Sequence, residues 1–182
     1  MNVFHAIELR RSVRAYTAAA VEKEKLEAIV KAGNLAPVFG RFHITVIQDP
    51  ALLQAINQTT LERMKHSGND FLEKRAATEG YIPLYGAPVL LVLSAPHGND
   101  RSGFNMANVS CAAENMILAA TELGLGTCFV MGPMLAFDNP ELAEKLSLPA
   151  DMVPLVGVLV GYPAEPLAAN ARKTPENVTY LI

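Results

Sequence analysis

The segment from Phe104 to Leu125 is the longest strongly apolar stretch of the chain, and it constrains the fold more than any other feature. Polar residues interrupt it at Asn105, Asn108, Ser110, Glu114, Asn115, Thr121 and Glu122. No run therefore approaches the roughly 18 to 20 apolar residues that a membrane span needs. Apolar residues recur at helical spacing, at Val109, Ala113, Met116, Ala120 and Leu123. We expect a helix over residues 105–123 that is buried on several sides, in part by a second subunit.

The rest of the chain alternates between helical and strand-like patterns. Strands are expected at His43–Gln48, Val89–Leu93, Thr127–Met131 and Met152–Tyr162. Helices are expected at Val3–Leu9, at Val21–Lys31, from Leu52 towards Met64, and from Asn139-Pro140 through Leu146. The pattern predicts an α+β fold with a central sheet of mixed strand direction and helices on both faces. A chain of 182 residues with 51% apolar content favours one domain, residues 1–182.

Composition excludes several classes of partner and site. Fifteen basic and eighteen acidic side chains give a charge of −3, too weak a field for nucleic acid or an anionic membrane, so a small ligand is favoured. The two cysteines, Cys111 and Cys128, have apolar neighbours and are expected to be buried reduced thiols. The four histidines lack metal-ligand spacing, and we expect no metal site. The first residues lack a signal-peptide pattern, which favours a cytoplasmic protein.

Common catalytic and nucleotide-binding motifs are also missing. The sequence contains no Gly-x-x-x-x-Gly-Lys, Gly-x-Ser-x-Gly or His-Glu-x-x-His. Gly124-Leu125-Gly126 resembles part of a dinucleotide fingerprint, but it follows an expected helix and precedes an expected strand. The fingerprint needs the reverse order, because the phosphate sits at a helix N-terminus. We interpret these glycines as the end of a helix.

Arg10-Arg11-Ser12-Val13-Arg14 is the most informative polar segment. If the chain is extended there, Arg10, Ser12 and Arg14 point to one side and present two guanidinium groups and a hydroxyl, donors that suit a phosphate monoester. The alternative is that the basic residues favour the C-terminus of the preceding helix. A second basic pair, Arg172-Lys173, is by itself typical of an ordinary solvated pair, and a functional role is the alternative.

The order of several short motifs resembles the nitroreductase family along nearly the whole chain. These motifs are Arg10 to Arg14, Ala36-Pro37, Tyr85-Gly86-Ala87-Pro88-Val89, Asn115 to Ala120, Leu123 to Cys128, Gly161 to Glu165, and Arg172-Lys173. The resemblance implies an intertwined homodimer with FMN bound between the subunits. We also expect residues 163–182 to form an extension that packs on the partner. Residues 177–182 alternate like a strand and are expected to pair with the partner's sheet, and the alternative is a frayed tail.

The resemblance further implies which residues contact FMN. Arg10, Ser12 and Arg14, with neighbouring Arg11, would hold the phosphate and ribityl chain, together with Arg172 and the less certain Lys173. Met131 and Gly132 would lie near the flavin ring, and the loop at Pro37, Val38 and Phe39 would cover the flavin of the other subunit. That loop lacks the family's usual polar residues and is short. Phe39, Arg41 and Phe42 either shape the pocket or simply pack.

The implied activity is that of an FMN-dependent oxidoreductase. Reduced nicotinamide, NAD(P)H, would deliver hydride to the flavin, and a nitroaromatic or quinone-like acceptor would then be reduced in a ping-pong cycle. The flavin carries the chemistry, so no catalytic acid or base is required. Two alternatives remain: a non-catalytic flavin-binding or sensing protein, and a structural dimer without FMN.

Overall fold

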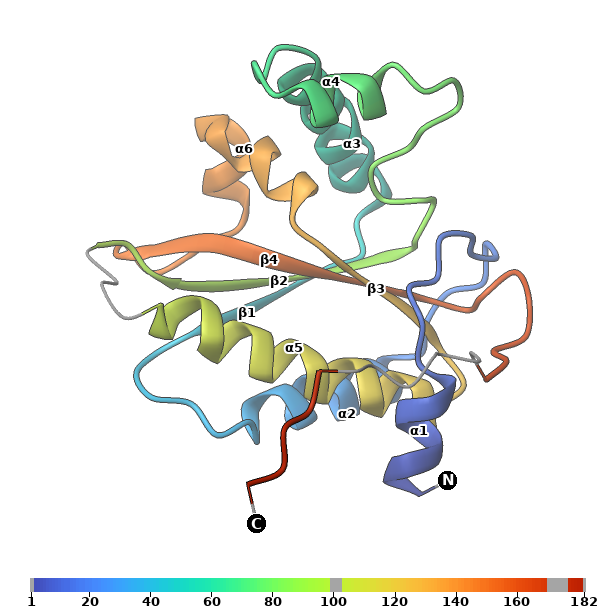
Figure 1. Ribbon diagram of the computed structural model, residues 1–182. Helices are drawn as coiled ribbons and strands as arrows, with labels where there is room; N and C mark the ends of the chain where they lie inside the picture. Colours follow the sequence, from blue (N-terminus) through green and yellow to red (C-terminus); the bar gives the residue numbers. More distant parts are fainter. Residues whose placement is uncertain (1, 99–102, 170–176, 182) are drawn as a thin grey trace.

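A computed structural model describes residues 2–98, 103–169 and 177–181 of the chain (Figure 1). Its helices are α1 (Val3–Leu9), α2 (Lys23–Asn34), α3 (Pro50–Lys65), α4 (Asp70–Ala76), α5 (Phe104–Glu122), α6 (Pro140–Lys145) and the 3-10 helix η1 (Gly132–Asp138). Its strands are β1 (His43–Ile47), β2 (Val89–Pro96), β3 (Gly126–Val130) and β4 (Met152–Gly161). Every helix and strand expected over residues 3–162 is present, with ends shifted by a few residues.

The four strands form one sheet in the order β1-β2-β4-β3, and each neighbouring pair is antiparallel. The expected mixed strand direction is therefore wrong for these strands. The sequence shows that long helical connections join the strands, but it does not show at which end of the sheet each connection returns the chain. Among the described residues, the one parallel pairing is an isolated bridge from Ser12 to Thr127 in β3.

Helices cover both faces of the sheet, as the sequence predicts (Figure 1). On one face, α2 and α5 pack on Val89, Leu91 and Leu93. On the other face, α3, η1 and α6 pack on Leu90 and Val92. Successive residues of β2 thus enter opposite cores, which explains why its sequence is apolar without interruption.

The α5 helix is buried against α2 and the sheet, and Met116 is fully buried. A Cβ at Gly33 of α2 would lie 2.8 Å from the Met116 Cγ, so glycine allows the two helices to approach closely. Gly124, with φ of +76°, ends α5 as expected. Cys128 is buried, but Cys111 is exposed on α5, which corrects its expected burial within one chain. The composition of α5 shows that the helix is apolar, but it does not show which face of the helix the rest of the chain leaves uncovered.

Two further features complete the description of the chain. No helix in the described residues is long and apolar enough to cross a membrane. Residues 177–181 form neither a helix nor a strand in the single chain, and Val178 and Tyr180 are exposed. Their expected pairing with a partner subunit stays a prediction.

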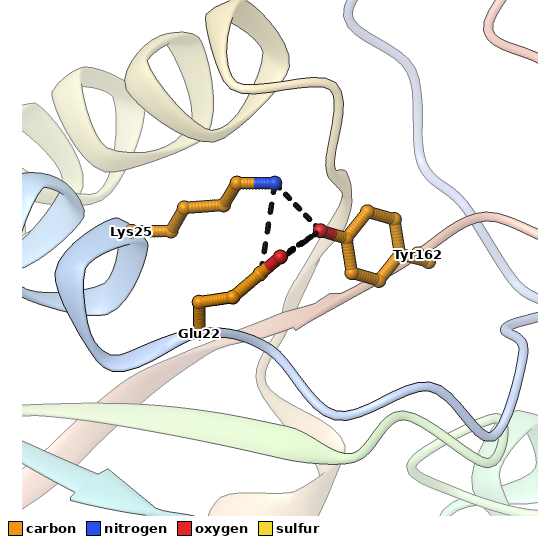
Figure 2. Close-up of polar contacts among 3 residues, drawn as sticks. All are labelled: Glu22, Lys25 and Tyr162. Carbon is orange, nitrogen blue, oxygen red and sulfur yellow. Dashed lines mark hydrogen bonds and ion pairs between the residues drawn. The ribbon is translucent and has the colours of Figure 1, made fainter.

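Tyr162 connects the end of β4 to the beginning of α2 (Figure 2). The Lys25 Nζ donates to the Tyr162 hydroxyl at 2.5 Å, and that hydroxyl donates to the Glu22 carboxylate at 2.8 Å. The Lys25 Nζ also lies 3.5 Å from Glu22 Oε2. The Glu22 carboxylate accepts from its own backbone and from Tyr162, and these hydrogen bonds hold its pKa below the usual range. The cluster fixes the point at which the chain leaves the sheet.

Replacing Tyr162 by phenylalanine should therefore make the protein less stable and less sensitive to acid. Because the folded-state pKa of Glu22 is lowered, its stabilisation is present above the unfolded-state pKa and is lost as the pH falls through the folded value. The melting temperatures of parent and Tyr162→Phe should differ more at pH 7 than below about pH 4. A difference that does not change with pH would contradict this role. Lys23→Ala, in a highly exposed ion pair with Glu27, is the control.

Candidate functional site

The segment after α1 becomes extended at the edge of the sheet. Arg10 is the C-cap of α1, with φ of −61° and ψ of 132°. Ser12 then forms its parallel bridge to Thr127, and the Val13 N–H donates to the Thr127 carbonyl at 2.8 Å. Val13 is buried, whereas Ser12 and Arg14 are exposed. The alternation expected from the sequence thus holds from Ser12 to Arg14.

Arg11, Ser12 and Arg14 line a hollow of about 240 Å³, which we call the arginine hollow. Its other wall is the chain just after β4, through Pro163 and Glu165. An Arg11 guanidinium nitrogen donates to the Pro166 carbonyl at 3.2 Å. The hollow therefore forms where the first extended segment meets the beginning of the C-terminal extension.

Arg10 does not line this hollow, which corrects the prediction that it shares one side with Ser12 and Arg14. Its Nε lies 3.4 Å from the Glu114 Oε1, on α5. The reason is local, because the alternation of an extended chain begins only after the C-cap of α1. Arg11, its neighbour, takes the place in the hollow instead.

Aromatic and basic side chains beside Arg14 escaped the sequence analysis. The Arg14 guanidinium carbon lies 5.9 Å from the centre of the Tyr85 ring, and Arg75 of α4 donates to the Tyr85 hydroxyl at 2.6 Å. The Arg75 guanidinium also lies 4.8 Å from the centre of the Tyr81 ring. Tyr85 belongs to a motif noted in the sequence, but nothing in the sequence pairs Arg75 with it. The guanidinium groups of Arg14 and Arg75 therefore both contact Tyr85.

Buried groups support the segment from below. The Tyr16 hydroxyl donates to the Val13 carbonyl at 2.9 Å, and burial raises the pKa of Tyr16 well above its usual value. Burial likewise raises the pKa of the Cys128 thiol, although the charge of Arg14 and a hydrogen bond with Ser12 oppose this. Cys128 is therefore held as a neutral thiol beneath the segment.

The loop after α2 lies at the opposite end of α5 from α1 (Figure 1). The Phe39 N–H donates to the Asn108 Oδ1 at 2.9 Å, and the Asn108 Nδ2 donates to the Phe39 carbonyl. The centres of the Phe39 and Phe104 rings are 5.6 Å apart. Both rings border a second hollow of about 390 Å³, which we call the phenylalanine hollow. One chain therefore does not bring Phe39 to the arginine hollow.

Residues 7–162 match the Nitroreductase family. The chain belongs to the nitroreductase family. An NADPH-dependent FMN reductase of Bacillus subtilis is 24% identical, with 98% of this chain and 72% of that protein covered. A nitroreductase of Bacteroides fragilis with bound FMN is 28% identical and has a TM-score of 0.85, with 100% of this chain and 99% of that chain covered. One from Desulfitobacterium hafniense, at 23% identity and a TM-score of 0.88 over the full length of both chains, shows the shared fold.

The other family-derived site residues of this nitroreductase are scattered in the single chain. Met131 follows β3 and is exposed, and Gly132 begins η1. Pro37 and Val38 adjoin Phe39 in the loop at the far end of α5. Arg172 and Lys173 lie outside the described residues. Among the residues described, no group of three histidine, cysteine or acidic side chains could hold a metal ion.

The donors of the arginine hollow fit the phosphate end of FMN. Two arginines and a serine hydroxyl match a phosphate monoester, although the Glu165 carboxylate reduces the net positive charge. A volume of about 240 Å³ is below the roughly 300 to 1,000 Å³ usual for a ligand pocket. A hollow of this size could take the phosphate end of an FMN but not the whole cofactor.

Proposed function

We propose that this nitroreductase is an FMN-dependent oxidoreductase that transfers hydride from NAD(P)H to an electron-poor acceptor by a ping-pong mechanism. The observation that carries the proposal is the arginine hollow, which places Arg11, Ser12 and Arg14 where a phosphate can be held. Nitroaromatic and quinone-like compounds are the acceptor classes. Because the reaction consumes NAD(P)H, we also propose that the protein works in the cytoplasm.

The residues of the chain bind and orient the cofactor in this proposal. Arg11 and Arg14 neutralise the phosphate, and the Ser12 hydroxyl donates to it. Tyr85 supports Arg14 from the side, while Val13 anchors the segment in the core. Bound there, FMN would supply the redox chemistry, carrying two electrons from NAD(P)H to an acceptor such as a quinone, whose reduction to a hydroquinone would take its protons from water. No side chain has to transfer a proton.

We further propose that the active unit is a homodimer of the single domain, with residues 163–182 packed on the partner. Exposed apolar side chains gather on α1, at Val3, Phe4 and Ile7. Such a surface is typical of a subunit interface. A dimer would also allow the loop at Phe39 of one subunit to approach the arginine hollow of the other.

Deleting residues 176–182 should lower FMN content and dimer stability together. Within the described sheet, β1 is an edge strand, and a groove of about 530 Å³ lies between it and α2. Leu26, Val30 and Val46 line that groove. Val178 and Tyr180 alternate with other residues along the chain, so in a strand paired with β1 both would lie on one face and could contact these apolar side chains. Gel filtration, melting temperature and FMN content measure the effect. A second variant, Val178→Asp with Tyr180→Asp, should act in the same direction without shortening the chain.

The dimer proposal has a clear contrary result. If the truncated protein remains a fully flavinated dimer with an unchanged melting temperature, the strand exchange is wrong. The free edge of β1 would then be protected in some other way.

Steady-state kinetics test the proposed function. The ping-pong mechanism predicts parallel double-reciprocal lines when NADPH and 1,4-benzoquinone are varied. Intersecting lines would contradict it. Very slow oxidation of NADPH despite bound flavin would instead favour the non-catalytic flavin-binding protein.

A further inference from the structure

We propose that Asn108 is a positioning residue that fixes Phe39, so that Phe39 and Phe104 form an aromatic wall for a planar aromatic acceptor. This inference rests on the proposed oxidoreductase function and specifies its substrate class. Asn108 lines neither hollow directly, so it acts through the backbone of Phe39.

The contacts of Asn108 with the loop are unusually complete. Its side-chain amide accepts from the Phe39 N–H at 2.9 Å and donates to the Phe39 carbonyl. One side chain thus pairs with both hydrogen-bonding groups of a single loop residue. Asn108 is only 5% exposed, so its amide is held rigidly within α5. A buried amide that loses such partners is costly, which makes this arrangement strongly preferred.

The loop also turns at the next residue. Gly40 has φ of +107°, a conformation that favours glycine. A Cβ at Gly40 would lie 3.8 Å from the Asn108 Nδ2, so strain rather than a clash opposes substitution there. Asn108 on one side and this turn on the other determine the direction of the Phe39 side chain.

The ring of Phe39 is held in place without being buried. Phe39 is 76% exposed and Phe104 is 50% exposed, although their ring centres lie 5.6 Å apart. In the single chain the backbone of Phe39 is therefore fixed while its ring is presented. The adjoining phenylalanine hollow, of about 390 Å³, is large enough for a single aromatic ring.

Two described polar groups beside this hollow have partners in the segment before β4. Arg41 is paired with the Asp151 carboxylate, and the His97 N–H donates to the Asp151 carbonyl at 2.5 Å. These contacts connect the loop to the segment before β4. Phe39 and Phe104 give this hollow an apolar side, which favours an aromatic ring stacked against it.

The test compares Asn108→Ala with Asn115→Ala in the full-length flavinated protein. Asn115 is also on α5, and its amide donates to the Ala32 carbonyl at 3.2 Å, so it is a matched control remote from Phe39. In Asn108→Ala the KM for nitrobenzene should rise about tenfold, which corresponds to about 1.4 kcal/mol. Turnover with ferricyanide, which is not aromatic, should stay at the parental value in the flavin-loaded variant. Asn115→Ala should leave the KM for nitrobenzene unchanged.

Asn108→Asp provides a readout that a purely structural role would not produce. A neutral carboxylic acid can accept from the Phe39 N–H and donate to its carbonyl, whereas a carboxylate can only accept. The raised KM for nitrobenzene should therefore fall towards the parental value as the pH is lowered and the carboxylate is protonated. Neither the parent nor Asn115→Ala should show this dependence.

Two outcomes would overturn the assignment: an unchanged KM in Asn108→Ala, and an equal rise in Asn115→Ala. The proposed function fails separately, because it requires the parent protein to oxidise NADPH with ferricyanide before any variant is compared.

Discussion

Replacing Arg14 by alanine is expected to weaken FMN binding by about 1.5 to 3 kcal/mol, which is about 10- to 150-fold in Kd. Arg14 lines the arginine hollow, lies beside the Tyr85 ring and would lose a charged hydrogen bond to the phosphate. Arg11→Ala should have a similar effect, because Arg11 lines the same hollow. Fluorescence titration of the apoprotein with FMN measures both.

Arg10→Ala should weaken FMN binding less than Arg14→Ala, since Arg10 is already paired with Glu114 and lies outside the hollow. Arg63→Ala, an exposed arginine of α3, is the control for a general loss of positive charge. Unchanged FMN affinity in both Arg11→Ala and Arg14→Ala would refute the assignment of the phosphate site.

Gly126→Ala should destabilise the protein by about 1 to 3 kcal/mol, the usual cost of overpacking, and should also weaken FMN binding. A Cβ at Gly126 would lie 2.9 Å from a Val13 methyl carbon and 3.1 Å from the Pro163 Cβ. Val13 lies between Ser12 and Arg14, so a shift of Val13 displaces the phosphate donors on both sides. Urea unfolding and FMN titration measure the two effects.

Gly157→Ala separates stability from cofactor binding. A Cβ there would lie 2.9 Å from the Leu90 Cδ1, in the core beneath α3 and η1, and Val13 is not among its nearest contacts. It should destabilise the protein by a similar amount, but the folded variant should keep its FMN affinity. If both glycine variants lose FMN equally, the loss reflects general instability rather than the position of Val13.

Local patterns predicted much of the fold. Asn139 caps α6, with its side chain accepting from the Glu141 and Leu142 N–H groups, as the Asn-Pro pair indicates. The apolar run of β2 and the helical spacing of α5 also depend on neighbours close in sequence. By contrast, α4 and η1, of seven residues each, were not predicted from the sequence.

The candidate site was only partly predictable, because its contacts join distant segments. Ser12 and Arg14 follow from alternation, whereas the pairing of Arg10 with Glu114 spans α1 and α5. The contacts of Asn108 with Phe39 connect residues 69 positions apart. No local pattern distinguishes that asparagine from Asn105 or Asn115 on the same helix. The family resemblance predicted which segments matter, but not which side chains share a hollow.

The central claim is that this nitroreductase binds FMN and reduces it with NAD(P)H. The most direct test is the visible absorption spectrum of the purified protein, recorded without oxygen before and after addition of NADPH. We expect a yellow protein with one FMN per subunit, whose flavin absorption is bleached by NADPH and restored by 1,4-benzoquinone. A colourless protein that stays colourless after incubation with FMN, or a bound flavin that NADPH and NADH do not bleach, would contradict the account.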